Sequence, residues 1–305
     1  MVTMDAQQAL RQLVDLYLLR CEVEGKSPRT VRAYRETLGR FAVIVTVQRP
    51  DEVTTEHLYE YLGRFTHLRP ETRHRYFREA RCFFNWLVDA GYLEVSPFRG
   101  MRNVRVPQRI VQPFSAEDVT TLLEACGEGA MGARDRALVM TLLDTGARCS
   151  EVVQLELADL DLRGRRLRVL HAKGDKQRVV PFAARCESAL REYLEVRGSA
   201  PGPLFVASTG HGELVPELAL QPNGLKQMLR RLGKKTGIPK VHAHRFRHTF
   251  ATWAIAHDAR ELDVQYLLGH ASPDMVRRSS SSSRSEQGAL RHVNFSPADQ
   301  MLGWQ

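Results

Sequence analysis

The side chains best suited to chemistry lie in two short segments of the second half of the sequence. Residues 244–252 read HRFRHTFAT, which places His244 and Arg247 three positions apart at the predicted start of a helix. Further on, His270 follows a Leu-Leu-Gly sequence that predicts the end of a helix. Guanidinium groups bind phosphoryl oxygens, and imidazoles can move protons near neutral pH. These residue types favour chemistry on a phosphate group.

A second arginine, Arg148, is predicted to lie at a junction between two helices. Residues 133–143 predict a buried helix, which Gly146 ends within the segment DTGARCSEV. Ser150 and Glu151 suit the start of the following helix. A planar guanidinium held at such a junction can approach a phosphate with two parallel hydrogen bonds.

The segments between these motifs predict a small antiparallel sheet and a basic helix. Residues 159–182 alternate in a β pattern, with turns at Gly164 and at residues 174–175. Residues 209–222 are predicted to be a loop, and Asn223 is predicted to cap a basic helix that runs to residue 236.

The first hundred residues predict a helical unit that is rich in arginine. Ser27 and Pro28 predict an N-cap and a first helical position, and a later helix begins at Pro70 and ends before Gly91. Arginines recur every three or four residues beside the apolar stripe of that later helix, which suits phosphate contacts, although a solvated basic face is the alternative. The residues predicted to contact DNA are Arg29, Arg32, Arg73, Arg78, Arg81, Lys176, Lys226, Arg230, Arg231 and Lys235.

The charge balance also favours a polyanionic partner. The sequence has 44 Lys and Arg against 35 Asp and Glu, a formal net charge of +9, and nucleic acid is the commonest partner of such proteins. Its 5 cysteines form no C-x-x-C pair, which predicts free, buried thiols and a cytoplasmic location. The N-terminus lacks a signal-peptide pattern and the apolar runs are too short to span a bilayer, so no membrane association is expected.

The motifs together resemble the catalytic core of the tyrosine recombinases, the family of the phage integrases and the Xer-type recombinases. T-G-x-R-x-S-E around Arg148, H-x-x-R at residues 244–247 and L-L-G-H ending at His270 match the family's motifs. K-G-x-x-x-R, which begins at Lys173, matches the surroundings of the family's hairpin lysine, and Lys176 is the alternative.

The resemblance implies a role for each of five residues. Arg148 and Arg247 would neutralise the nonbridging oxygens of the phosphate. His244 and His270 would bind the phosphate and help to position or deprotonate the nucleophile, and Lys173 would protonate the leaving 5′ oxygen. This chemistry requires neither a metal nor another cofactor.

The family's nucleophile is missing from this sequence. In the family a tyrosine follows the second histidine by nine residues, but here that position holds Ser279, and no tyrosine occurs after Tyr266. A serine hydroxyl is less acidic than a phenol, whose pKa is about 10, and it lies closer to the backbone. The chain is therefore expected to be deficient in strand cleavage. The serines at 280–283 leave the register open, and either an introduced substitution or natural degeneracy would account for the change.

Three other interpretations fit the sequence less well. Histidines between residues 242 and 248 could suggest zinc, but Arg245 replaces the glutamate of H-E-x-x-H. A type IB topoisomerase would use similar residues, but the chain length and the L-L-G-H spacing favour a recombinase. A DNA-binding accessory or regulatory protein would explain the lost tyrosine, but not the retained Lys173 and His270.

The resemblance implies a mainly α fold with a small β-sheet, arranged as a two-domain clamp. Residues 1–105 would form a helical core-binding domain that binds DNA, residues 106–114 a linker, and residues 115–305 an α+β catalytic domain with a C-terminal tail. The expected function is site-specific recombination of double-stranded DNA through a 3′-phosphotyrosine and a Holliday junction. The expected assembly is a homotetramer on two duplexes, joined through the tail.

Overall fold

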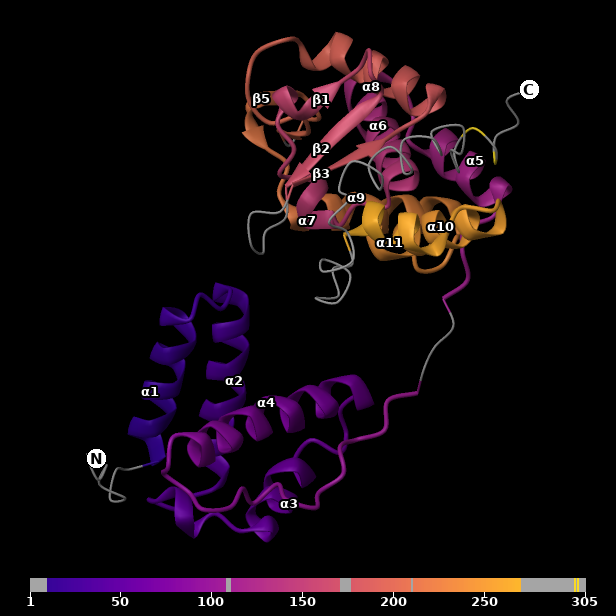
Figure 1. Ribbon diagram of the computed structural model, residues 1–305. Helices are drawn as coiled ribbons and strands as arrows, with labels where there is room; N and C mark the ends of the chain where they lie inside the picture. The colour runs from indigo at the N-terminus through magenta and orange to yellow at the C-terminus, as the bar shows by residue number, and fades with distance from the viewer. Residues whose placement is uncertain are drawn as a thin grey trace. The chain divides into compact units, whose positions relative to one another are not determined.

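The chain folds into two compact units, Met1–Arg109 and Ile110–Gln305. The computed structural model describes residues 10–107, 111–170, 177–209, 211–269, 299 and 301. Within these ranges both units are mainly helical, and the second also contains two small antiparallel sheets (Figure 1). The predicted mainly α fold with a small sheet is confirmed. None of the helices in the described ranges is long and apolar enough to cross a membrane.

The described part of the first unit is helical and starts its second helix where the sequence predicts. The Oγ atom of Ser27 accepts a hydrogen bond from the backbone N–H of Thr30 at 3.2 Å, and Pro28 takes the first helical position. The elements of this unit are α1 (Leu10–Val23), α2 (Pro28–Ile44), the 3-10 helix η1 (Pro50–Glu52), α3 (Thr55–Gly63) and α4 (Pro70–Asp89).

Aromatic side chains fill the core of the first unit. Phe41 of α2 lies edge-on to Tyr61 of α3, with ring centroids 5.1 Å apart, and to Phe84 of α4 at 5.4 Å. Tyr17 of α1 meets Phe83 of α4 in the same way at 5.4 Å. Edge-to-face contacts of this kind add to the free energy gained by burying the rings, so they fix α1 and α2 against α4 and α3 against α2.

The second unit is organised around the buried helix α6. Almost every residue of α6 after its first turn is buried, and the helix packs against α8 and α10. Ser115 caps the preceding helix as predicted, because its Oγ accepts the backbone N–H of Asp118 at 3.1 Å. The helices of this unit are α5 (Ala116–Ala125), α6 (Gly129–Thr145), α7 (Cys149–Val152), η2 (Leu157–Asp159), α8 (Ala184–Arg197), α9 (Pro222–Thr236), α10 (Ala243–Ala256) and α11 (Glu261–Leu268).

The predicted hairpin forms the larger of the two sheets. Its strands β1 (Leu160–Asp161), β2 (Arg166–Leu170) and β3 (Gln177–Pro181) are antiparallel in that order. Leu167 pairs with Val180, and Val169 pairs with Arg178. All four side chains are buried, so Arg178 lies on the core face of the sheet.

Three details differ from the sequence predictions. The predicted loop at 209–222 contains the strand β5 (Leu214–Ala219), which pairs with β4 (Val206–Ser208); Pro216 and a register shift hide the β pattern. Helix α9 starts at Pro222 after the N-cap Gln221, because proline is well suited to the first helical position, so Asn223 is not the cap. All five cysteines are free as predicted, but only Cys21 and Cys186 are buried, since Cys126 and Cys149 are half-buried and Cys82 is exposed.

Candidate active site

Arg148 lies in the short connection between α6 and α7. Gly146 ends α6 with φ 57°, and a Cβ atom there would lie 2.7 Å from Leu268 and 2.8 Å from Phe250. A glycine is therefore required for both the backbone conformation and the close packing. Two residues later, the Arg148 side chain is 40% exposed, while its Nη1 donates to Glu151 Oε1 at 2.7 Å. The predicted helix junction is confirmed, and the guanidinium remains accessible.

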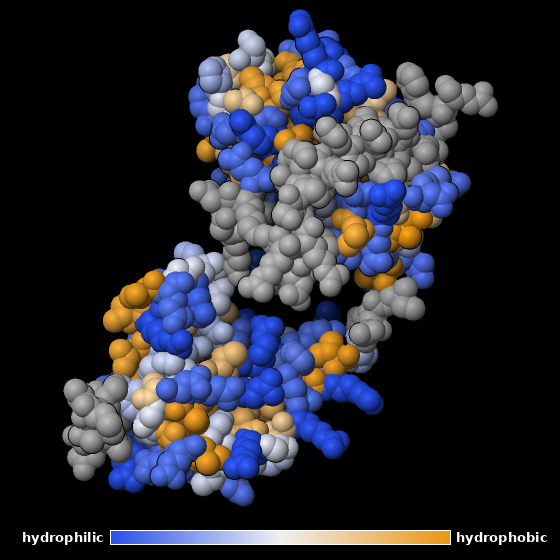
Figure 2. All heavy atoms as spheres, in the orientation of Figure 1, coloured by the Kyte–Doolittle hydropathy of each residue, from blue (hydrophilic) through white to orange (hydrophobic). Residues whose placement is uncertain are grey.

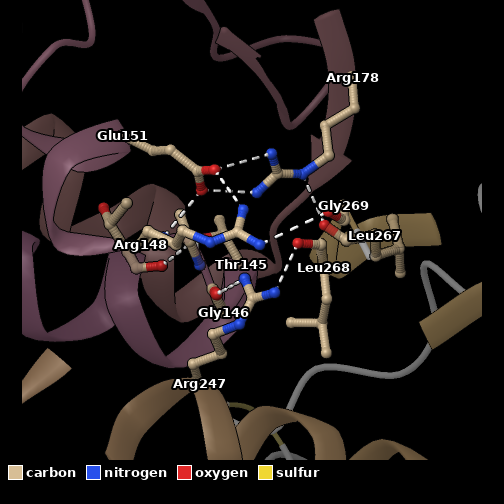
Figure 3. Close-up of polar contacts among 11 residues, drawn as sticks. Thr145, Gly146, Arg148, Glu151, Arg178, Arg247, Leu267, Leu268 and Gly269 are labelled. Carbon is tan, nitrogen blue, oxygen red and sulfur yellow. Dashed lines mark hydrogen bonds and ion pairs between the residues drawn. The ribbon is translucent and has the colours of Figure 1, made fainter. Parts of the chain in front are cut away.

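Arg247 approaches the same place from α10. Its side chain is only 5% exposed, and its two amino groups donate to the carbonyl oxygens of Gly146 at 2.9 Å and of Leu268 at 2.6 Å (Figure 3). These carbonyls lie at the C-terminal ends of α6 and α11, which carry partial negative charge. Arg247 therefore links α10 to the C-terminal ends of α6 and α11, next to Arg148.

The orientation of α10 is fixed by Arg245, for which the sequence predicted no structural role. Its Nε donates to the carbonyl of Gln112 at 2.9 Å and its Nη1 to that of Pro239 at 2.7 Å, and its guanidinium lies 3.9 Å from the ring centroid of Phe114. The Nδ1 of His242 accepts the backbone N–H of Arg245 at 3.1 Å and so caps the helix. These contacts anchor the end of α10 that carries Arg247.

Two further charged residues complete the cluster. Glu151 of α7 and Arg178 of β3 are 3% and 4% exposed. Arg178 holds the carboxylate with both amino groups, at 2.8 Å and 3.3 Å, and donates from Nε to the carbonyl of Leu267 at 2.7 Å. Both residues belong to the family motifs in the sequence, Glu151 to T-G-x-R-x-S-E and Arg178 to K-G-x-x-x-R, but no role in the site was predicted for either. The alternation of β3 places Arg178 among core residues, where a buried charge requires a partner.

The charged groups of the cluster shift the pKa values of one another. Burial would raise the pKa of Glu151, but hydrogen bonds from Arg178 and Arg148 outweigh it and lower that pKa to about 2. Burial and the positive charge of Arg148 lower the pKa of Arg247 to about 10. Both groups are ionised at pH 7. Among the residues that the structure describes here, three guanidinium groups lie around one carboxylate, so an excess of positive charge is available to an anion.

The structure brings together some of the predicted site residues. Arg148 and Arg247 meet, and His244 is exposed one helical turn before Arg247 on α10. The predicted site residues Lys173, Lys176, His270 and Ser279 lie outside the described residues. The described neighbour of His270, Gly269, accepts a long hydrogen bond of 3.5 Å from Nη2 of Arg148.

The residues predicted to contact DNA differ in their exposure and in their contacts within the protein. In the first unit Arg29, Arg32, Arg78 and Arg81 are exposed and Arg73 is half-buried. In α9, Arg231 pairs with Asp135 at 3.1 Å and Lys235 donates to the carbonyl of Ala125 at 2.9 Å. Lys226 and Arg230 are exposed and take part in no ion pair with the described residues. Hydrophilic residues cover much of the visible surface of each unit (Figure 2).

The described residues include no group of three His, Cys, Asp or Glu side chains that could hold a metal ion. The Nδ1 of His242 is already occupied as the cap of α10, and the positive charge of Arg245 acts on the same imidazole and would repel a cation. The cluster is therefore suited to an anion.

Most of the chain matches known protein families. Residues 112–284 match the phage integrase family, and residues 13–94 match the SAM-like N-terminal domain of phage integrases. A tyrosine recombinase XerC from Pelobacter propionicus is 31% identical over 276 residues, which cover 87% of this chain and 89% of the relative. A tyrosine recombinase XerD from Listeria innocua is 29% identical over 86% of this chain and 91% of its own length.

Solved structures share the fold. A lambda integrase tetramer bound to a Holliday junction aligns over 89% of this chain and 80% of its own, with a TM-score of 0.70 and 15% identity. The Tn1549 transposon integrase in complex with transposon right-end DNA aligns over 93% of this chain and 99% of its own, with a TM-score of 0.68 and 18% identity. The sequence matches and the fold show that the chain belongs to the phage integrase family of tyrosine recombinases.

Proposed function

We propose that this chain binds specific double-stranded DNA sites as a recombinase does, but does not cut them. The observation that carries the proposal is the pair of guanidinium groups of Arg148 and Arg247, which converge on one place from two helices and are braced by Glu151 and Arg178. Two such groups neutralise the charge that develops on the nonbridging oxygens during phosphoryl transfer.

The family motifs indicate which residues would position the reacting groups and protonate the leaving oxygen. Transesterification replaces one phosphodiester with another: a phenol oxygen attacks phosphorus, the 5′ oxygen leaves, and a 3′-phosphotyrosine remains. His244 and His270 would orient the phosphate and the nucleophile, and Lys173, or alternatively Lys176, would give the leaving oxygen its proton. Repetition of the exchange on a second duplex produces and resolves a Holliday junction.

Ser279 stands where the family's motif has the nucleophile. Its hydroxyl is a weaker acid than a phenol and is carried on a much shorter side chain, so in-line attack on a phosphate positioned for tyrosine is disfavoured. The chain would therefore bind and pair its sites without forming the covalent intermediate.

The proposed architecture on DNA follows the domain predictions. Residues 1–105 would bind DNA, with residues 106–114 as the linker and residues 115–305 as the catalytic domain and tail. A homotetramer joined through that tail would hold two duplexes. The exposed arginines of the first unit and Lys226 and Arg230 of α9 would contact phosphates.

A second function is supported by the absence of a tyrosine after Tyr266. A recombinase descendant could act as a DNA-binding accessory or regulatory protein. In that case catalysis would play no part, and restoring the tyrosine would have no consequence.

Covalent capture on nicked duplex DNA distinguishes the two functions. The binding site would first be selected from a pool of random duplexes, and a nicked version would then trap any cleaved strand on the protein. We expect no adduct from the chain itself and an adduct from Ser279→Tyr. Arg148→Ala in the Ser279→Tyr protein should abolish capture while binding persists.

The other outcomes have definite meanings. An adduct formed by the chain itself would show that the nucleophile lies elsewhere. Site binding without an adduct from Ser279→Tyr would favour the accessory function. Capture that survives Arg148→Ala would remove Arg148 from the proposed site.

A further inference from the structure

Glu151 is shared between two arginines that approach its carboxylate from different elements. Arg178 of β3 uses both amino groups, at 2.8 Å and 3.3 Å, whereas Arg148 uses only Nη1, at 2.7 Å, and its backbone N–H, at 2.8 Å (Figure 3). Arg178 is 4% exposed, and Arg148 is 40% exposed. The buried arginine therefore binds the carboxylate with both amino groups of its guanidinium, whereas the exposed arginine uses one amino group and its backbone N–H.

This division of contacts determines what Arg148 can do. In an isolated pair, a carboxylate and a guanidinium form two parallel hydrogen bonds, and the pair carries no net charge. Because Arg178 also binds Glu151 and supplies a second positive charge, the charge of Arg148 is not cancelled. The second amino group of Arg148 makes only a long hydrogen bond of 3.5 Å to the carbonyl of Gly269, and the side chain is 40% exposed. Glu151 then orients Arg148 without neutralising it.

Arg178 also reaches a third element. Its Nε donates to the carbonyl of Leu267 at 2.7 Å, close to the end of α11. In the sequence, Arg178 follows Lys173 by five residues, and Leu267 precedes His270 by three. The side chain thus joins the strand that follows the predicted lysine, the helix that carries Glu151, and the helix that leads to the second predicted histidine.

We infer that Arg178 is a positioning residue for strand cleavage, which holds Arg148 in an orientation that can bind the scissile phosphate and fixes the end of α11 beside it. This inference rests on the proposed function, in which Arg148 binds that phosphate. The competing explanation is that Arg178 only stabilises the core of the second unit.

The test compares variants in the Ser279→Tyr protein on the selected nicked duplex. We expect Arg178→Met to slow adduct formation about 100-fold, the scale of a small misplacement of a catalytic group, without weakening binding to the site. Arg178→Lys, which keeps the charge but not the fork, should recover part of the rate. Arg168→Met is the matched control, because Arg168 lies on β2 and pairs with the buried Asp159 at 2.9 Å, and it should leave the rate unchanged.

A second measurement needs neither DNA nor cleavage. Carboxyl NMR of the chain as it stands should show that Arg178→Met raises the pKa of Glu151 from about 2 toward its usual 4.5. An unchanged pKa would overturn the inference whatever happens on DNA. Equal losses of rate in Arg178→Met and Arg168→Met, or no loss in either, would also overturn it.

The failure of the proposed function would look different. If the Ser279→Tyr protein itself forms no adduct, cleavage by this site is refuted. The NMR comparison would still decide whether Arg178 controls Glu151 and, through it, Arg148. If Arg178→Met does not fold, both the rate of adduct formation and the pKa of Glu151 are measured in Arg178→Lys. We expect Arg178→Lys to form the adduct more slowly than the parent, and an unaltered rate would refute the positioning role.

Discussion

The buried carboxylate of Glu151 gives the second unit a stability that should depend on pH in a defined way. Its pKa is about 2 in the folded chain against a usual 4.5. A lowered carboxyl pKa stabilises the folded state above pH 4.5, and this contribution is lost as the pH falls from 4.5 toward 2. The difference corresponds to about 3 kcal/mol.

Glu151→Gln tests this expectation because it keeps the size of the side chain and removes the charge. We expect the variant to lower the free energy of unfolding of the second unit by about 3 kcal/mol at pH 7, since Arg178 is left buried without its counter-charge. The difference in the free energy of unfolding between the two proteins should be smaller by about 1 kcal/mol at pH 4 and by about 2 kcal/mol at pH 3, because Glu151 becomes protonated in the parent as the pH falls.

Amide hydrogen exchange of α6 is the suitable assay, because this buried helix reports on the second unit separately from the first. Glu192→Gln on α8 is the control: Glu192 pairs with Arg136 but is 48% exposed, so its loss should cost less than about 1 kcal/mol. A gap between Glu151→Gln and the parent that stays constant from pH 7 to pH 3 would refute the assignment of the stability to this carboxylate.

Two further predictions concern the end of α6 at the candidate site and the surface of α9 that is proposed to contact DNA. Gly146→Ala should lower the free energy of unfolding of the second unit by about 3 kcal/mol, because the alanine would strain the backbone and clash with neighbouring side chains. Gly237→Ala is the control, because Gly237 also ends a helix but has open space around it, and it should cost about 1 kcal/mol. Urea titration of both variants measures these costs. Replacing Lys226 and Arg230 together with alanine should reduce the slope of log affinity against log salt concentration by about 2 in a DNA-binding titration. Arg191→Ala on α8 is the control and should leave the slope unchanged. Equal slopes for the parent and both variants would exclude α9 from the proposed DNA interface.

Local signals in the sequence were enough to predict many of the elements. The caps at Ser27 and Ser115 and the helix end at Gly146 each depend on a few neighbouring residues, because capping bonds join positions at most four apart. The strands β2 and β3 follow from the alternation of apolar and polar residues along each segment. The motifs at residues 145–151 and 244–247 likewise identified the arginines that meet at the candidate site.

The start of α9 and the presence of β5 could not be settled in this way. Two local preferences compete at Pro222 and Asn223, and the packed helix uses the proline. Strand β5 contains Pro216 and lacks a clear alternation, so its pairing with β4 becomes visible only when both strands lie side by side.

The sequence by itself determined the family, the helical architecture and the identity of Arg148 and Arg247. Only the tertiary structure decided how they are held. Arg247 bonds to the carbonyl of Gly146, 101 positions away, and Arg178 of β3 shares Glu151 with Arg148. Such contacts depend on the packing of whole elements, because a buried charge is tolerated only where the fold supplies its partner, and no local pattern specifies which partner that will be.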